Sequence, residues 1–236
     1  MTALGRWARR TRMAADTRER HAIVSGLAGT PATVLDVGGV AGEMEAFLPA
    51  ATVTSLNVGD ESADVHFDGS RIPYGDDSFE VAMSLDVLEH IPAPQRLGHV
   101  QELTRVAARR AILCCPLGTP EHVAAEREVA AWHREVTGGR HRFLEEHLER
   151  GLPTESELRE IAVAAGGFEL RFQGDFRSVV ELFRLGVLAR RRPTPGRLAR
   201  YASARLGGRA RPRLEERSNP YTNRAFLISQ PRPRGS

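Results

Sequence analysis

Short apolar runs alternate along the first half of the chain with segments whose apolar residues recur at helical spacing. The runs predict strands at residues 32–37, 52–58, 63–67, 79–85 and 111–115. After the fourth run, Leu97, Val100, Leu103 and Val106 recur at the three- and four-residue spacing of one helix face. Strands that alternate with helices form right-handed crossovers, which build a mostly parallel sheet covered on both faces. The pattern therefore predicts an α/β fold.

The N-terminal part of the chain is expected to be helical. Residues 16–28 place apolar side chains at helical spacing behind Asp16, which we expect to be the N-cap. After the glycines that end the first predicted strand, residues 43–48 resume helical spacing. We therefore expect an N-terminal helical segment over residues 1–30 and a single domain over residues 31–236.

Two segments interrupt the alternation. Residues 117–152 are polar and helical, and we expect them to form an inserted helical cap after the fifth strand. Residues 190–220 mix arginine, proline and glycine, which is typical of a mobile or loosely packed excursion. The remaining elements are predicted at residues 154–165 (a helix with a capping box), 168–173 (a strand), 177–190 (a helix) and 223–229 (a strand).

Composition narrows the class of protein. The chain has 236 residues, of which 41% are hydrophobic and 27% charged, enough for one domain with a full core. Every basic residue is arginine, and many of them lie in residues 184–217. Cys114 and Cys115 are adjacent and give no disulfide framework, and no apolar run approaches the roughly 18 residues of a membrane span. We expect a soluble protein of the reducing cytoplasm.

The most informative local feature is the sequence VLDVGGVAGE at residues 34–43. A buried strand ends in Asp36, and Gly38, Gly39 and Gly42 then let a ligand approach the backbone closely. The G-x-G-x-x-G spacing of pyrophosphate-binding turns is absent from this turn. Asp36 would repel a phosphate, whereas it suits a ligand that carries an ammonium and a sulfonium.

Residues 34–116 resemble class I S-adenosylmethionine-dependent methyltransferases, in particular their small-molecule group. Asp36, Gly38 and Gly42 match the first motif of that family, with Gly39 in the same turn, and Val40 replaces its middle glycine. The resemblance implies a Rossmann-like sheet of seven strands in the order 3-2-1-4-5-7-6, with the last strand antiparallel. It also implies S-adenosyl-L-methionine as the cofactor.

Three further segments carry the resemblance. Asn57 stands where the family has an acid that binds both ribose hydroxyls, and its amide can still accept one hydrogen bond. Asp68 and Gly69 lie in a segment that resembles the family's adenine-binding loop. The fourth predicted strand and the turn after it resemble the part that lines the methionine portion of the cofactor and the acceptor pocket, which here is Ser84, Leu85 and Asp86.

A methyl group on a sulfonium is already activated, so positioning can replace a catalytic side chain. His90 and His141 are the candidates for a general base, although the family resemblance favours a packing role for the Glu89-His90 pair. His122, His133, His141 and His147 cluster in the insert, but without a tight two-ligand spacing such as H-E-x-x-H. We therefore predict no metal site.

The resulting hypothesis is methyl transfer to an oxygen, nitrogen or carbon of a small molecule. One alternative is a non-catalytic protein that keeps the fold, because Val40 and Asn57 both depart from the family pattern. Another is an acceptor at an anionic membrane or on an acidic partner, contacted through residues 190–217. We do not expect a nucleic-acid acceptor, and the sequence names neither the acceptor nor an oligomeric state.

Overall fold

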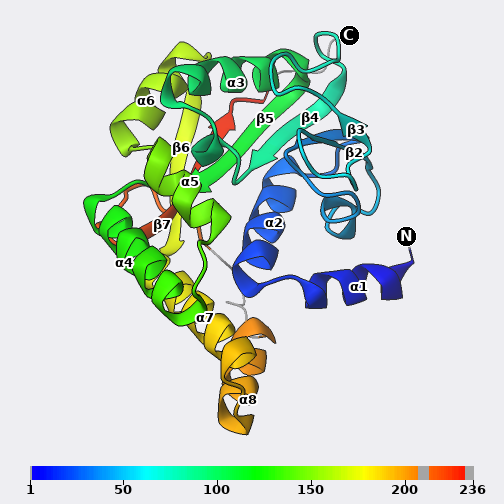
Figure 1. Ribbon diagram of the computed structural model, residues 1–236. Helices are drawn as coiled ribbons and strands as arrows, with labels where there is room; N and C mark the ends of the chain where they lie inside the picture. Colours follow the sequence, from blue (N-terminus) through cyan, green and yellow to red (C-terminus); the bar gives the residue numbers. More distant parts are fainter. Residues whose placement is uncertain (1, 207–212, 232–236) are drawn as a thin grey trace.

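The computed structural model describes residues 2–206 and 213–231 and contains one sheet of seven strands (Figure 1). The strand order is β3-β2-β1-β4-β5-β7-β6. The neighbours from β3 to β5 pair in parallel, and β7 runs antiparallel to both β5 and β6. This confirms the predicted order. The strands are β1 Thr33–Val37, β2 Thr52–Asn57, β3 Val65–His66, β4 Phe79–Leu85, β5 Ala107–Pro116, β6 Phe168–Asp175 and β7 Thr222–Ser229.

Helices cover both faces of the sheet. They are α1 Ala3–Arg12, α2 Ala15–Ala28, α3 Ala93–Val106, α4 Pro120–Thr137, α5 Arg142–Arg150, α6 Glu155–Ala164, α7 Phe176–Arg191 and α8 Pro195–Leu206, with the 3-10 turns η1 Met44–Ala46 and η2 Leu88–His90. One core cluster joins the sheet to α3 and α6, and a second joins its other face to α2 and η1. In β4, Ala82 belongs to the first cluster and Val81 and Met83 to the second. Because both faces are buried, the central strands β1 and β4 are mostly apolar.

The predicted insert is helical and consists of α4 and α5. Thr119 caps α4 by accepting a hydrogen bond from the His122 backbone N–H, and Gly138 ends the helix in a left-handed conformation. The two helices pack together, and α4 also packs against α7, so they stand at one end of the sheet (Figure 1). Among the described residues, none of the helices combines the length and the apolar character that a membrane crossing requires.

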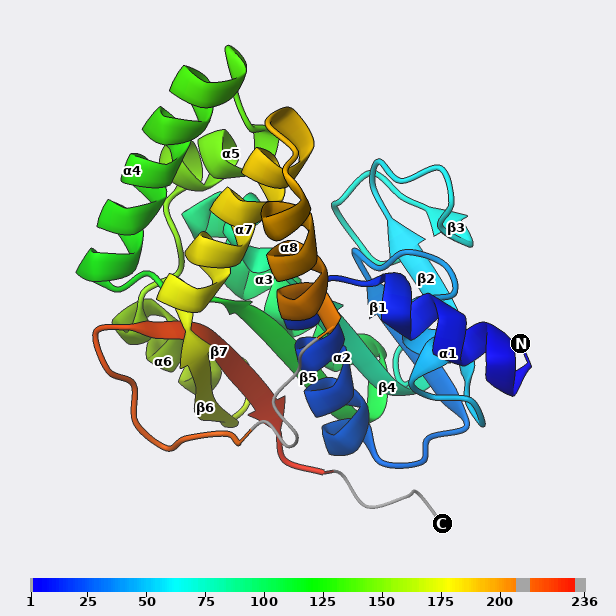
Figure 2. The ribbon, with the colours of Figure 1, turned by 90° about the horizontal axis from the view of Figure 1, so that it is seen from below.

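Three local expectations are corrected. The helix expected at residues 43–48 is only the turn η1, since Pro49 disfavours helical backbone at the residue before it. Asp16 is not an N-cap: helix α2 begins one residue earlier, and the Asp16 carboxylate instead pairs with Arg224. Residues 190–220 include helix α8, which lies beside α2 and α7 (Figure 2), while residues 207–212 lie outside the described part.

Candidate functional site

The candidate site lies where the parallel strands end. The carboxyl ends of β1, β2, β4 and β5 meet at one edge of the sheet. Strand β7 is antiparallel and starts at this same edge, where Arg224 pairs with Pro116 of β5. In open α/β sheets this edge holds ligands, because the loops that follow the strands leave a crevice there. This edge is therefore where a ligand would bind.

The turn after β1 needs glycine. Gly38 and Gly42 have φ angles of 83° and 82°, a left-handed conformation that side chains disfavour. A Cβ atom on Gly38 would lie 2.2 Å from the Val87 side chain, and one on Gly39 would lie 2.2 Å from a carboxylate oxygen of Asp36. The turn is therefore folded tightly over Asp36. We call Asp36, Gly38, Gly39 and Gly42 the glycine corner.

Asp36 is buried beneath this turn, where the ionised form of its carboxyl is unfavourable. Burial raises the pKa of Asp36 to about 7, and the nearby carboxylates of Glu45 and Glu43 add to the increase. The cation of Arg20 acts in the opposite direction. An additional positive charge at the glycine corner would favour the ionised carboxylate, so the corner is suited to a cationic ligand.

Asn57, at the end of β2, stabilises the glycine corner by hydrogen bonds. Its amide nitrogen donates to the backbone carbonyls of Gly38 and Gly39, at 3.0 and 3.1 Å, and its amide oxygen accepts from the Gly59 N–H at 3.2 Å. A carboxylate in this place has no donor for the two carbonyls. The chain therefore uses the asparagine to hold the turn, and the predicted ribose contact stays a prediction.

Asp68 and Gly69 lie in an exposed loop close to the end of β2. The Asp68 carboxylate accepts hydrogen bonds from the backbone N–H and the hydroxyl of Ser70, at 2.9 and 2.5 Å, which lowers the pKa of Asp68. A Cβ atom on Gly69 would contact Val58, which follows β2 directly. The loop is thus folded back beside the second strand, and its proposed contact with adenine remains a prediction.

Of the three residues predicted at the end of β4, Ser84 and Leu85 are buried and Asp86 lies at the edge of the sheet. The Ser84 hydroxyl is buried 3.0 Å from Nε2 of His99 on α3, so this side chain belongs to the core. Leu85 is buried on the other face of the sheet, in the cluster with α2. The two side chains point to opposite faces of the sheet, as alternate strand residues do. The predicted contacts of Ser84 and Leu85 with the cofactor stay predictions.

Asp86 is the residue of this segment that reaches the edge. Its backbone has a positive φ of 53°, and its carboxylate lies 3.0 Å from Arg224 and 3.2 Å from Arg20. These two arginines hold the pKa of Asp86 well below its usual range. Arg224 also pairs with Asp16 at 3.3 Å, which links α2, the end of β4 and the start of β7. Asp86 is therefore an anchor of the edge rather than a free carboxylate.

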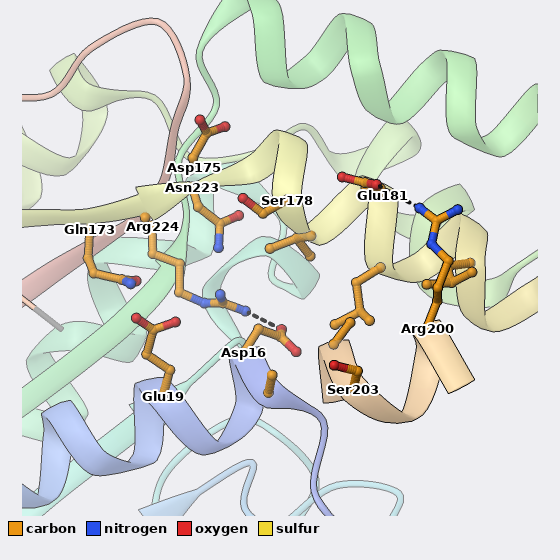
Figure 3. Close-up of a pocket in the computed structure, with 16 residues that line it drawn as sticks. Asp16, Glu19, Gln173, Asp175, Ser178, Glu181, Arg200, Ser203, Asn223 and Arg224 are labelled. Atoms are coloured by element: carbon orange, nitrogen blue, oxygen red, sulfur yellow. Dashed lines mark hydrogen bonds and ion pairs between the residues drawn. The ribbon is translucent and has the colours of Figure 1, made fainter. Parts of the chain in front are cut away.

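A cavity of about 610 Å³ opens beside this network (Figure 3). Helix α2, the end of β6, the start of β7, and helices α7 and α8 supply its walls. Its lining mixes charged and polar side chains with the apolar surface of α7. The lining residues used below are Asp16, Glu19, Asp175, Val179, Glu181, Arg200 and Arg224. Sequence reasoning missed the cavity, since these residues lie in distant segments that no motif connects.

Helix α1 lies across the glycine corner. The Arg9 guanidinium would be 2.8 Å from a Cβ atom on Gly42, and it donates to the Ala41 carbonyl at 3.1 Å. Arg10 donates to the Ala46 carbonyl at 2.8 Å, and its guanidinium lies over the ring of Phe47. The helix thereby covers the turn from outside. No sequence pattern indicated this contact.

The two candidate bases lie in or against the helical insert. His90 Nδ1 lies 2.9 Å from the Glu146 carboxylate of α5, and His141 precedes α5 with its ring beside Phe183. Burial lowers the pKa of both imidazoles and so favours their neutral forms. Neither residue lines the cavity. The structure therefore brings neither of them to the described pocket as a base.

Comparison with known proteins gives one family and a set of similar folds. Residues 35–115 match the family described as methyltransferase domain. A Thermotoga maritima protein, an S-adenosylmethionine-dependent methyltransferase provisionally described as a histamine N-methyltransferase, is 14% identical with a TM-score of 0.54, and the match covers 95% of this chain and 94% of that one. A Galdieria sulphuraria protein, provisionally described as a sarcosine dimethylglycine methyltransferase, is 17% identical with a TM-score of 0.52 over 87% and 80% of the two chains. No curated protein matches the sequence.

Proposed function

We propose that the protein transfers a methyl group from S-adenosylmethionine to a small molecule, because residues 35–115 match the methyltransferase domain family. The cofactor would bind at the glycine corner, and the acceptor would enter the cavity beside Arg224. The observation that carries the proposal is the buried Asp36 beneath a turn that only glycine can form, at the edge where the cavity opens.

The charge at the glycine corner supports a sulfonium compound over a pyrophosphate. A phosphate would lie against Asp36 and the carboxylates of Glu43 and Glu45, and like charges at close range repel. The ammonium and sulfonium of S-adenosylmethionine would instead stabilise the ionised form of Asp36. In class I methyltransferases, which the chain resembles, the same turn holds this cofactor.

Methyl transfer from a sulfonium requires no nucleophilic side chain. A lone pair of the acceptor attacks the methyl carbon, the carbon–sulfur bond breaks, and its electron pair stays on sulfur as S-adenosylhomocysteine forms. An acceptor hydroxyl or amine then loses its proton to solvent or to a nearby base. Alignment of acceptor, carbon and sulfur can supply roughly 7–11 kcal/mol of the barrier. The protein's contribution is therefore to hold the two ligands in line and to exclude water.

The charges of the cavity favour an uncharged or cationic acceptor. Its lining has four carboxylates, Asp16, Glu19, Asp175 and Glu181, against two arginines. Arg224 is already paired with Asp86 and Asp16, and Arg200 lies 3.9 Å from Glu181. Among the described residues of the lining, no excess of positive charge remains for an anionic acceptor. This makes the arginine-rich segment a weaker candidate for binding the acceptor.

A cavity-filling variant tests the proposal. Val179 lines the cavity, so Val179→Trp should block the acceptor while leaving the glycine corner intact. The protein is incubated with a metabolite extract and S-adenosylmethionine that carries a labelled methyl group, and labelled products are identified by mass spectrometry. We expect a labelled small molecule with the wild type and at least a roughly tenfold lower yield with Val179→Trp.

The matched control is Val163→Trp, on the exposed surface of α6, where the side chain is 79% exposed. This variant should label the product as the wild type does. A second candidate function, binding of the cofactor without transfer, is favoured by Asn57 and Asp86, whose side chains already have partners within the chain. Calorimetric binding of the cofactor with no labelled product from any extract would favour that candidate and contradict the enzymatic proposal.

A further inference from the structure

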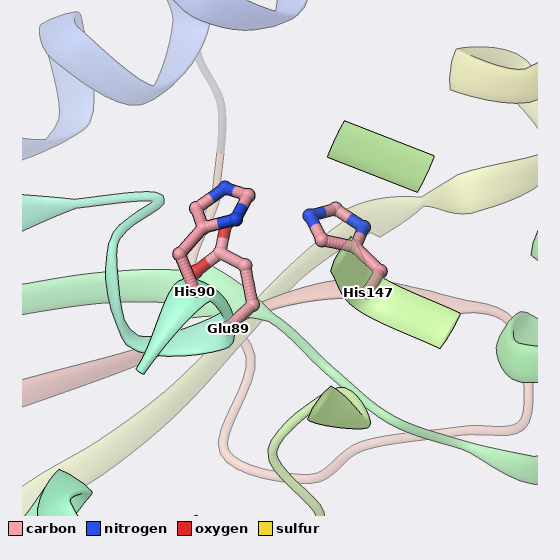
Figure 4. A group of neighbouring side chains, drawn as sticks. All are labelled: Glu89, His90 and His147. Atoms are coloured by element: carbon pink, nitrogen blue, oxygen red, sulfur yellow. The ribbon is translucent and has the colours of Figure 1, made fainter. Parts of the chain in front are cut away.

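Three metal-ligating side chains from two segments meet beside the end of β4 (Figure 4). Glu89 and His90 come from η2, and His147 comes from helix α5 of the insert. One nitrogen or oxygen atom from each residue lies within 4.8 Å of the other two. Two imidazoles and a carboxylate form a ligand set that divalent transition metals prefer.

The cluster contains buried polar atoms whose hydrogen-bonding capacity is unused. Glu89 is 1% exposed, and its Oε2 atom has no hydrogen-bond partner among the described residues. Nε2 of His147 is also buried and lacks a hydrogen bond within the described part of the chain. A buried polar atom without a partner is costly and rare in a folded protein. A bound cation would satisfy both atoms at once.

The orientation of His147 suits a metal ligand. Its Nδ1 lies 2.9 Å from Oε1 of Glu126, a buried carboxylate on α4, and therefore donates a hydrogen bond to it. That bond fixes the tautomer in which the proton is on Nδ1 and the Nε2 lone pair is free. A metal-bound histidine commonly donates a hydrogen bond from its other ring nitrogen to a carboxylate, as His147 does here.

We propose that Glu89, His90 and His147 bind one divalent transition-metal ion. Ligand atoms around an ion such as Zn²⁺ lie about 3–4 Å apart, so the cluster has to contract only slightly. Glu146, whose carboxylate lies 2.9 Å from His90 Nδ1, stands next to the same imidazole and would become a further ligand or a hydrogen-bond acceptor. Three protein ligands leave coordination positions open for water or a substrate atom.

The position of the cluster gives the ion a role in the proposed function, on which this part of the inference rests. Glu89 follows Asp86 by three residues, in the turn η2 after β4. Asp86 in turn pairs with Arg224 of the cavity wall. None of the three ligand residues lines the cavity, so an ion held there would join η2 to α5 and would position the end of β4 beside the cavity wall.

The sequence predicted no metal because its histidines lack a tight two-ligand spacing. The folded chain supplies the ligands differently, since the insert brings His147 against the turn that follows β4. The 5.0 Å separation of the His90 and His147 rings arises from this packing of α5 on η2. No spacing within either segment could have indicated it.

Metal binding can be measured without cofactor or acceptor. The full chain is stripped with a chelator, incubated with Zn²⁺ or Co²⁺, desalted and analysed for metal by mass spectrometry, with the visible spectrum of Co²⁺ as a second readout. We expect about one ion per chain, bound through imidazole and carboxylate. Glu89→Gln and His147→Ala should each lose stoichiometric binding, and Glu126→Gln should weaken it roughly 10- to 100-fold.

His66→Ala is the matched control, because this exposed histidine lies on β3 at the far edge of the sheet and should not change binding. Circular dichroism establishes that each variant is folded, and the conservative Glu89→Gln and Glu126→Gln keep the side-chain volume. A wild-type chain that retains no ion, or Glu89→Gln and His147→Ala proteins that bind as the wild type does, would overturn the proposal. Cofactor titration of the same samples shows separately whether the glycine corner works.

Discussion

Among the predicted cofactor residues, Asp36 is the one whose ionised side chain is least favourable where it lies. Its surroundings therefore indicate the charge of the ligand. Its carboxyl is buried, and its pKa is raised to about 7 by burial and by the carboxylates of Glu45 and Glu43. A buried charge of this kind is costly unless a partner compensates it. The simplest explanation of its place under the glycine corner is a ligand that brings positive charge.

This position makes stability depend on pH. The unfolded chain releases the Asp36 proton near its ordinary pKa of 3.8, whereas the folded chain keeps it until about pH 7. Asp36 therefore favours folding below about pH 4, and this contribution is lost as the pH rises to 7, by up to about 4 kcal/mol. We expect Asp36→Asn to flatten the fall of the melting temperature between pH 4 and 7. Identical pH profiles for the two proteins would refute this explanation.

The same carboxyl should govern cofactor affinity. Because S-adenosylmethionine favours the ionised carboxylate, its affinity should increase as the pH rises from 6 to 8 and then level off. Asp36→Asn should weaken binding by roughly tenfold at pH 8 and remove this dependence. Calorimetric titrations at several pH values provide the measurement. An Asn variant that binds as tightly as the wild type at pH 8 would separate Asp36 from the cofactor.

Among single residues, the sequence identified those whose role is local to one turn. Asp36, Gly38 and Gly42 were recognised from one motif, and the structure shows why glycine is needed at Gly38. Arg9 and Arg224 were not identified, because each acts on residues that are distant in the sequence. Asn57 was predicted to contact the ribose, which stays a prediction; the structure adds two hydrogen bonds by which Asn57 holds the turn.

At the level of elements, Arg96 of α3 connects α3 to η2 and to α6. The sequence did not predict these contacts. It is buried at 1% exposure, and its guanidinium donates to both Glu157 carboxylate oxygens, at 3.0 and 2.9 Å. It also donates to the carbonyls of Leu88 and Ile91, at 3.1 and 3.0 Å, which hold η2 in place. Arg96 therefore fixes the turn that carries Glu89 and His90 against α3 and α6.

Removal of this side chain should destabilise the protein strongly. Arg96→Met leaves the Glu157 carboxylate without its partner and the backbone carbonyls of Leu88 and Ile91 without this donor, at an expected cost of about 3–5 kcal/mol. Arg159→Met, which removes an exposed pair with Glu155 on α6, should cost no more than about 0.5 kcal/mol. Urea unfolding gives the free energy of unfolding of both variants. Equal decreases in the two variants would contradict this role of Arg96.

Element boundaries were predicted best where both faces of a segment are buried. Strand β4 has the bounds that the apolar run predicted. Strand β5 begins at Ala107, before the predicted residue 111, because Arg109 pairs with Glu80 at 3.1 Å and Arg110 donates to the Leu27 carbonyl. These charged side chains interrupt the apolar pattern, so the sequence did not predict the start of β5. Helix α8 was also missed, since its arginines and its preceding prolines are typical of a loop.

At the level of the whole molecule, the strand order came from the family resemblance and was confirmed. The cavity and the Glu89, His90 and His147 cluster were not predictable, because both are made by contacts between distant segments. Both lie at the carboxyl edge of the sheet, next to the network of Asp86 with Arg20 and Arg224. We therefore propose that cofactor, acceptor and metal bind at one edge of one sheet.

The most direct test of this account is a calorimetric titration of the wild-type chain with S-adenosylmethionine, S-adenosylhomocysteine and NAD⁺. We predict one site per chain for the two adenosyl sulfur compounds, with dissociation constants of roughly micromolar order, and no binding of NAD⁺, whose pyrophosphate would face Asp36. Absence of binding of both sulfur compounds at high micromolar concentration, or tighter binding of NAD⁺, would contradict the account.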